Sequence, residues 1–135
     1  MRFGTSRSVI VGDYDNDGDL DVLVTNNGGR VQLLRNENAT GLAWSMLDLV
    51  PRGGARHALN ARVEVRAGGG LFRREVRPHV GYWSSHDPRV HFGLGEAKVI
   101  DRLTVTWPDR SVETWSDVPV NRHLRLQQGV SPRID

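Results

Sequence analysis

Apolar and polar residues alternate along much of the chain, which is typical of β-strands that bury one face. No apolar pattern with the 3.6-residue period of a helix persists. The stretches 67–70 (Ala-Gly-Gly-Gly) and 108–110 (Pro-Asp-Arg) separate neighbouring alternating segments, and each predicts a hairpin turn. We therefore expect an all-β fold of antiparallel sheets, with strands at residues 30–36, 61–67, 71–77, 101–107, 111–115 and 122–128.

The chain is expected to contain two parts. Residues 1–40 hold an acidic loop, a strand that begins at Asp21 and a second strand that ends at Asn36. Arginine-rich strands occupy residues 41–130, and residues 131–135 form a short tail. With 135 residues the chain suits one compact domain with a small unit attached. The first part is too small to hold a core alone, so we expect it to pack on the second.

The composition excludes several classes of protein. No run approaches the roughly 18 apolar residues that a transmembrane helix needs, so membrane insertion is not expected. Near the N-terminus only Val9–Val11 form an apolar run, which is too short for a secretory signal. The chain has no cysteine, which rules out disulfides, thiolate nucleophiles and cysteine-based zinc sites.

The positive charge of the chain is unevenly distributed. Five of its 16 acidic residues lie between residues 13 and 21, so the remainder is distinctly basic, and 17 of its 18 cationic residues are arginine. These arginines fall singly along strand-like segments rather than in a block. Specific nucleic-acid binding is therefore not expected.

The acidic loop has the pattern D-x-D-x-D-G-x-x-D, with a glycine at position 18. Oxygen ligands at alternate positions, followed by a glycine that permits a sharp turn, are what Ca²⁺ requires. The pattern predicts that the loop binds calcium, which would neutralise the neighbouring carboxylates. We expect ligands from the side chains of Asp13, Asp15, Asp17 and Asp21 and from the backbone carbonyl of Asp19.

This loop differs from an EF-hand. The twelfth position, where an EF-hand has a bidentate glutamate, is Val24, and the flanking segments are strand-like. Two alternatives stay open: a solvated acidic turn without metal, and a Mg²⁺ site. Magnesium is the weaker candidate because it keeps its water and demands octahedral geometry.

The segment 79–95 offers two further candidate sites. Ser84, His86 and Asp87 are of the residue types of a catalytic triad, but neighbours in sequence seldom reach triad geometry and no nucleophile elbow is present. The spacing of the five histidines likewise matches no zinc motif. A ligand platform is a second hypothesis, because aromatic rings stack on sugars and arginine binds anions. Its residues would be Tyr82, Trp83 and Arg89.

Two family resemblances cover nearly the whole chain. The sequence VIVGDYDNDGDLDVLVTNNGGRVQLLRNE, residues 9–37, resembles an FG-GAP or VCBS repeat, the calcium-loop unit of integrin-type β-propellers. The second part resembles the ASPIC/UnbV domain, which follows such repeats in proteins similar to cartilage acidic protein. This second resemblance rests on NARVEVRAGG (60–69), REVRPHVGYWSSHDPRVHFGLGEA (74–97), IDRLTVTWPD (100–109) and DVPVNRHLRL (117–126).

The resemblances imply a fold and a function. They imply one FG-GAP calcium-loop β unit packed with a β-sandwich-like ASPIC/UnbV domain. Such a module would be an adhesion-type binding protein, with a protein or carbohydrate surface as partner and an extracellular or periplasmic location. An accessory or catalytic role in a biosynthetic or oxidative pathway is the alternative, since a UnbV-like protein is encoded with enediyne biosynthesis. The chain carries a single repeat where propellers string several together, so a homodimer formed through unpaired strand edges is also expected.

Overall fold

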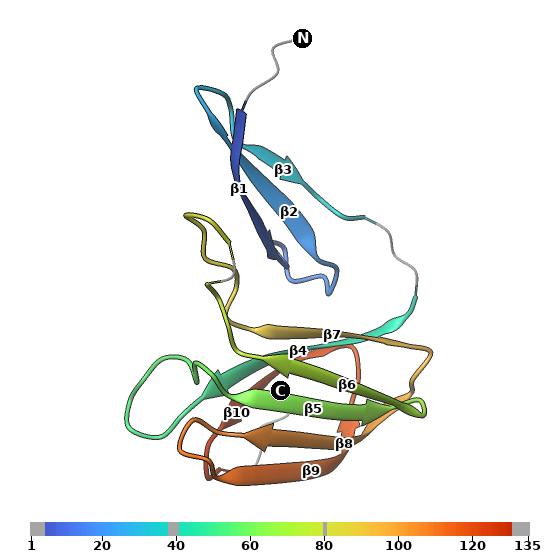
Figure 1. Cartoon of the computed structure of the whole chain (residues 1–135). Coiled ribbons are helices and arrows are strands. Elements are labelled where there is room, and N and C mark those ends of the chain that lie inside the picture. The colour runs from blue at the N-terminus through green and yellow to red at the C-terminus, as the bar shows by residue number, and fades with distance from the viewer. Residues whose placement is uncertain (1–4, 38–40, 80, 131–135) are drawn as a thin grey trace. The chain divides into compact units, whose positions relative to one another are not determined.

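The computed structural model describes residues 5–37, 41–79 and 81–130. Every regular element in these ranges is a β-strand, as the alternating pattern predicted. The chain divides into two compact units (Figure 1). The first consists of Met1–Thr40 and Arg77–Asp87, and the second of Gly41–Val76 and Pro88–Asp135. The predicted domain division at residues 40 and 41 stays a prediction, and the predicted tail 131–135 lies outside the described residues.

The first unit contains one antiparallel sheet with the strand order β1-β2-β3. Its strands are β1 (Thr5–Gly12), β2 (Asp21–Asn27) and β3 (Gln32–Leu34). Gly12 is paired with Asp21, so the acidic loop connects the adjacent ends of β1 and β2. Val22 is paired with Leu34, which brings the end of β3 beside the start of β2. This register places the residues that follow Leu34 next to the acidic loop.

The second unit contains two sheets that share one apolar core. One sheet has the order β6-β5-β8-β9 and the other the order β10-β4-β7 (Figure 1). Buried residues of both sheets, such as Val65 of β5 and Phe92 of β7, belong to the same hydrophobic cluster, which is the arrangement of a β-sandwich. The strands are β4 (Ala43–Val50), β5 (Arg62–Ala67), β6 (Gly70–Glu75), β7 (Val90–Gly95), β8 (Val99–Thr106), β9 (Val112–Pro119) and β10 (Arg122–Gln127).

Strand pairing departs from the sequence prediction at one place. All other named pairs are antiparallel, but β10 runs parallel to β4, with Leu124 beside Leu47. A parallel pair needs a long connection between its strands, and here the chain supplies one by forming β5 to β9 between them. The predicted turns at 67–70 and 108–110 do form the β5–β6 and β8–β9 hairpins.

The two units differ in how their interiors are built. Among the described residues, the buried hydrophobic side chains belong to the second unit, apart from Pro78 of the first. The described buried carboxylates, those of Asp13 and Asp21, both belong to the first. A small sheet without buried apolar side chains needs another source of stability. We infer that polar contacts around the acidic loop supply much of it.

No helix in the described ranges is long and apolar enough to span a membrane.

A polar contact network closes one end of the second unit. Gln128, which is 5% exposed, accepts a hydrogen bond at Oε1 from the backbone N–H of Arg52 (3.0 Å). Its Nε2 donates to Asp109 Oδ2 (2.7 Å) and to Ser111 Oγ (2.8 Å). The side chain therefore joins the end of β10 to the loop after β4 and to the β8–β9 turn.

Asp109 makes the stability of this end dependent on pH. The hydroxyl and backbone N–H of Ser111, together with the amide of Gln128, hold the pKa of Asp109 below its ordinary value of 3.8. A carboxylate with a depressed pKa stabilises the fold above its unfolded-state pKa, and this stabilisation is lost as pH falls through the folded-state pKa. We expect the free energy of unfolding to fall as the pH drops through the ordinary pKa of 3.8 and further toward the lower folded-state pKa. The Asp109→Asn variant should show a smaller fall.

Urea unfolding at a series of pH values, followed by tryptophan fluorescence, measures this difference. Asp101→Asn, which removes an exposed carboxylate from β8, is the control. Equal pH dependence in wild type and Asp109→Asn would contradict the expectation.

Candidate metal centre

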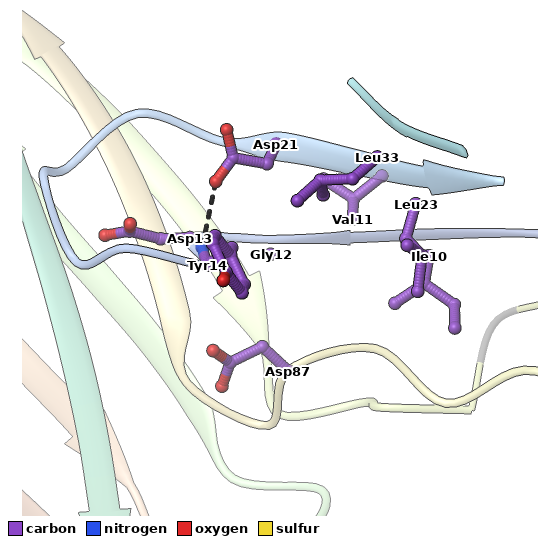
Figure 2. Close-up of a pocket in the computed structure, with 9 residues that line it drawn as sticks. All are labelled: Ile10, Val11, Gly12, Asp13, Tyr14, Asp21, Leu23, Leu33 and Asp87. Carbon is purple, nitrogen blue, oxygen red and sulfur yellow. Dashed lines mark hydrogen bonds between the residues drawn. The ribbon is translucent and has the colours of Figure 1, made fainter. Parts of the chain in front are cut away.

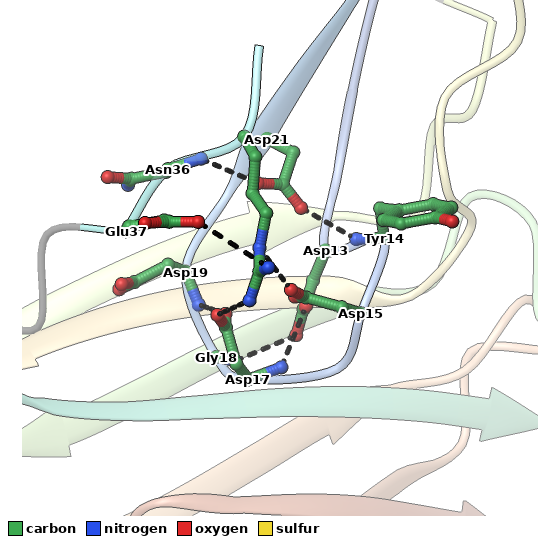
Figure 3. A network of polar contacts seen from close by, with 10 residues as sticks. Asp13, Tyr14, Asp15, Asp17, Gly18, Asp19, Asp21, Asn36 and Glu37 are labelled. Atoms are coloured by element: carbon green, nitrogen blue, oxygen red, sulfur yellow. Dashed lines mark hydrogen bonds and ion pairs between the residues drawn. The ribbon is translucent and has the colours of Figure 1, made fainter. Parts of the chain in front are cut away.

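The acidic loop forms a tight turn between β1 and β2 (Figure 3). Two of its residues have left-handed backbone conformations, Asn16 with φ of 60° and Gly18 with φ of 97°. Glycine takes a positive φ without steric cost, and asparagine tolerates it better than most residues. The predicted role of Gly18 in permitting the turn is consistent with this geometry. The turn directs several carboxylates toward its own interior.

Asp13 organises the loop from inside. Its carboxylate is 3% exposed and accepts two backbone hydrogen bonds, at Oδ1 from Asp17 N (3.1 Å) and at Oδ2 from Gly18 N (3.0 Å). These N–H groups have no strand partner, so the side chain satisfies donors that the turn would otherwise leave without one.

Asp21 joins the loop to the chain that follows β3. It is 2% exposed, and its Oδ1 accepts a hydrogen bond from Asn36 N (2.8 Å) while Oδ2 accepts one from Tyr14 N (2.9 Å). The N–H of Asn36, the N–H of Tyr14 and the nearby charge of Arg35 lower the pKa of Asp21, against the opposing effect of burial. Asp21 is therefore an ionised carboxylate at neutral pH.

Asp15 completes a cluster of three carboxylates. One oxygen each from Asp13, Asp15 and Asp21 lie within 4.8 Å of one another. Both oxygens of Asp15 are shielded from solvent, and neither accepts a hydrogen bond from a described residue. Its Oδ2 lies 2.6 Å from Nε of Arg35, an ion pair that lacks hydrogen-bond geometry. Buried carboxylate oxygens without hydrogen bonds are costly unless a cation compensates them.

The other predicted ligands have different surroundings. Asp17 Oδ1 accepts a hydrogen bond from Asp19 N (2.9 Å), and Asp17 Oδ2 lies 3.9 Å from Nη2 of Arg35. Neither Asp17 nor Asp19 is part of the cluster of three. Their predicted role as calcium ligands stays a prediction.

Two family descriptions match the chain. Residues 51–133, more than half of the sequence, match the family described as ASPIC and UnbV. The chain belongs to the ASPIC and UnbV family. Residues 4–62 match the FG-GAP-like repeat, so the acidic loop lies in that repeat, and both family resemblances seen in the sequence are confirmed. No curated protein matches the chain.

FG-GAP-like repeats generally bind calcium, and they are typically extracellular or periplasmic. The residues of this repeat fit such an ion. Asp13, Asp15 and Asp21 offer hard carboxylate oxygens, the ligand type that calcium prefers. Asp15 is the strongest indication, because one of its oxygens lies in the cluster and neither accepts a hydrogen bond from a described residue.

Sequence reasoning missed the residues of the repeat that follow β3. Arg35 contacts Asp15 and Asp17, and its Nη1 also lies 3.5 Å from Oε1 of Glu37. Asn36 donates to Asp21. The spacing inside the loop gives no hint of these contacts. The register of β2 with β3 could have indicated them, since it sets the residues after Leu34 beside Asp21.

An apolar pocket of about 330 Å³ adjoins the loop of the repeat (Figure 2). Ile10, Val11, Leu23 and Leu33 gather at one side of it, and Asp13, Tyr14 and Asp21 lie at the other. A deep pocket lined by Tyr82, His86, Asp87 and His91 would favour a catalytic role for the segment 79–95. Of these four residues only Asp87 lines the pocket in Figure 2.

The two histidines among these four residues have other roles. Nδ1 of His86 accepts a hydrogen bond from the backbone N–H of Val11 (3.0 Å), which ties residues 77–87 to β1. His91 belongs to β7 of the ASPIC/UnbV part, where its ring stacks on Trp44 with 6.5 Å between centroids.

The predicted ligand platform is divided between the two units. Tyr82 and Trp83 lie in the first unit, are 67% and 86% exposed, and have ring centroids 5.9 Å apart. Arg89 lies in the second unit, with Nη1 3.5 Å from Nδ1 of His123. The role of the three residues in binding a ligand stays a prediction.

Proposed function

We propose that this chain is a non-catalytic calcium-binding β module, in which the ion is structural and exposed surfaces bind a protein or carbohydrate partner. The observation that carries the proposal is the convergence of Asp13, Asp15 and Asp21 on one point. A bound calcium ion would neutralise these carboxylates and stabilise the turn between β1 and β2. The three residues have different roles. Asp13 accepts hydrogen bonds that stabilise the turn, Asp21 accepts one from Asn36, and Asp15 has oxygens that accept no hydrogen bond from a described residue and can coordinate the ion.

A structural ion suits the first unit because its three strands, β1 to β3, contain no buried hydrophobic side chain. Binding to the folded state alone adds stability in proportion to the logarithm of the ligand concentration. An ion that joins the ends of two strands would therefore fix the geometry of the surface that the strands present. Typical locations of FG-GAP-like repeats, outside the cytoplasm, supply millimolar calcium.

The exposed pair of Tyr82 and Trp83 supports the binding part of the proposal. Gly81 and Ser84 form an isolated β-bridge, so the two aromatic residues lie at the tip of a tight turn. Trp83 has φ of 54°, a left-handed conformation that costs a bulky residue on the order of 1–3 kcal/mol. Strain of this kind concentrates at functional sites, and exposed aromatic rings are typical contacts for sugars and protein partners.

Asp15→Asn separates binding of calcium from folding of the loop. Asp15 accepts no hydrogen bond from a described residue, and its ion pair with the half-exposed Arg35 contributes little free energy, so the variant should still fold in EDTA with at most a small loss of stability. In 5 mM CaCl₂, roughly 5 to 50 times a Kd typical of extracellular sites, wild type should gain about 1–2 kcal/mol and the variant almost nothing. Isothermal titration calorimetry should find one calcium ion per wild-type chain.

Hydrogen exchange of residues 13–21, in CaCl₂ and in EDTA, gives a local measure of the same effect. Asp101→Asn is the matched control and should keep the response to calcium. A wild type that binds no calcium in the calorimeter and shows no change in exchange would refute the proposed function.

A further inference from the structure

Arg35 competes for the same carboxylate that calcium would use. Its Nε lies 2.6 Å from Oδ2 of Asp15. Asp15 is also one of the three carboxylates in the cluster that would bind calcium. The two oxygens of Asp15 are shielded from solvent, so an approaching cation can reach them only if a neighbouring group moves. A guanidinium and a calcium ion that contact the same carboxylate group lie only a few ångströms apart and repel each other.

Arg35 is the group that can move. Its side chain is 51% exposed, whereas that of Asp15 is 23% exposed. A half-exposed arginine exchanges its ion pair for water at small cost, since exposed ion pairs contribute little net free energy. Asp13 and Asp21, in contrast, are held by backbone hydrogen bonds on both oxygens.

Glu37 gives the guanidinium a second partner. Nη1 of Arg35 lies 3.5 Å from Oε1 of Glu37, on a side chain that is 73% exposed. Arg35 therefore forms ion pairs with both Asp15 and Glu37, two residues that are labelled in Figure 3. The guanidinium can therefore release Asp15 and keep a carboxylate beside it. Its fork of donors allows both contacts at once, which a lysine ammonium cannot reproduce.

We propose that Arg35 is an intramolecular competitor of calcium, which pairs with Asp15 in the absence of the ion and is held by Glu37 when the ion takes Asp15. The inference rests on the proposed calcium site and adds the residue that sets its affinity. The ion pair neutralises the charge of Asp15 when calcium is scarce. It also raises the calcium concentration at which the loop binds the ion. A module of this kind would fold in the absence of calcium and would bind the ion only where its concentration is high.

Calorimetric titration of CaCl₂ into the full chain tests this role. We expect the calcium Kd of Arg35→Gln to be about threefold to tenfold lower than that of wild type, and that of Arg35→Lys to fall between them. Glu37→Gln should raise the calcium Kd by about twofold, because the guanidinium of Arg35 then has no carboxylate at position 37 to pair with and stays on Asp15. In EDTA, Arg35→Gln should speed hydrogen exchange of residues 13–21.

Arg30→Gln is the matched control for the loss of one positive charge, because no described carboxylate forms an ion pair with Arg30 in the structure. Its Kd should stay within about twofold of wild type. If wild type binds calcium and Arg35→Gln binds it equally or more weakly, the competitor role is overturned and the calcium site stands. If no variant binds calcium, both proposals fall. Should Arg35→Gln not fold in EDTA, an Arg35→Lys Kd equal to that of wild type overturns the inference.

Discussion

Asp13→Ala is expected to lower the free energy of unfolding of the first unit by about 2–3 kcal/mol, even in EDTA. The buried carboxylate accepts hydrogen bonds from Asp17 N and Gly18 N, and alanine would remove the acceptor of both bonds. Each buried polar group that loses its partner costs about 1–3 kcal/mol, although the exposure of Asp17 lets water replace part of the loss.

Hydrogen exchange of β1 and β2 in EDTA measures this effect where it arises. Exchange should become faster by about 30-fold to 150-fold in Asp13→Ala, the factor that corresponds to 2–3 kcal/mol. Asp15→Ala is the control, because it removes a carboxylate of the same cluster that accepts no hydrogen bond from a described residue, so only its ion pair with Arg35 is lost and the acceleration should be smaller. Equal acceleration in the two variants would show that charge, rather than hydrogen bonding, governs the loop. Asp13→Asn, which keeps one acceptor oxygen, should lie between wild type and Asp13→Ala.

The contrast between Asp13 and Asp15 shows how much the sequence can reveal about such a site. The alternation of aspartates with Gly18 indicated a turn, and the structure has a turn there in which three of the carboxylates lie close together, since period and glycine are local properties of the chain. That these residues bind calcium stays a prediction. Alternation alone treats all five aspartates as equivalent. Their division into Asp13 and Asp21, which accept hydrogen bonds from backbone N–H groups, and Asp15, which does not, depends on the conformation of the loop. Only the hydrogen bond from Asn36 to Asp21 depends on the register of β2 with β3.

Arg35 lay beyond the reach of sequence reasoning for a similar reason. It follows β3, and only the pairing of β2 with β3 brings it to the loop. A basic residue at that distance from an acidic loop has no motif to distinguish it from the other 16 arginines of the chain. Long-range contacts between charged side chains carry no period, so a single sequence does not record them.

The ASPIC/UnbV part shows the same limit within the fold. Strands with one exposed face, such as β5 and β10, follow the period-two pattern and were predicted. β4 was missed because consecutive residues Ser45, Met46 and Leu47 are all buried, which removes the alternation. Its parallel partner β10 lies at the far end of the sequence, and nothing local in either strand specifies that pairing.

Gln128→Leu should lower the free energy of unfolding of the second unit by about 2–4 kcal/mol. The side chain is buried and forms hydrogen bonds with three residues, Arg52, Asp109 and Ser111. Leucine has a similar size but offers no partner, so the N–H of Arg52 loses its acceptor and Asp109 loses a donor. Denaturant unfolding followed by tryptophan fluorescence measures the loss, because Trp107 and Trp115 lie in or against the core of this unit.

Gln127→Leu is the control, because it makes the same change of residue type at an exposed position. Gln127 is the last residue of β10 and is exposed, so its replacement should change the free energy of unfolding by less than about 0.5 kcal/mol. The two neighbouring glutamines thus differ only in what their side chains contact. A similar loss for both variants would mean that Gln128 does not join β10 to the β8–β9 turn. A loss confined to Gln128→Leu, with calcium binding unchanged, would show that the sandwich is closed by polar contacts independent of the acidic loop.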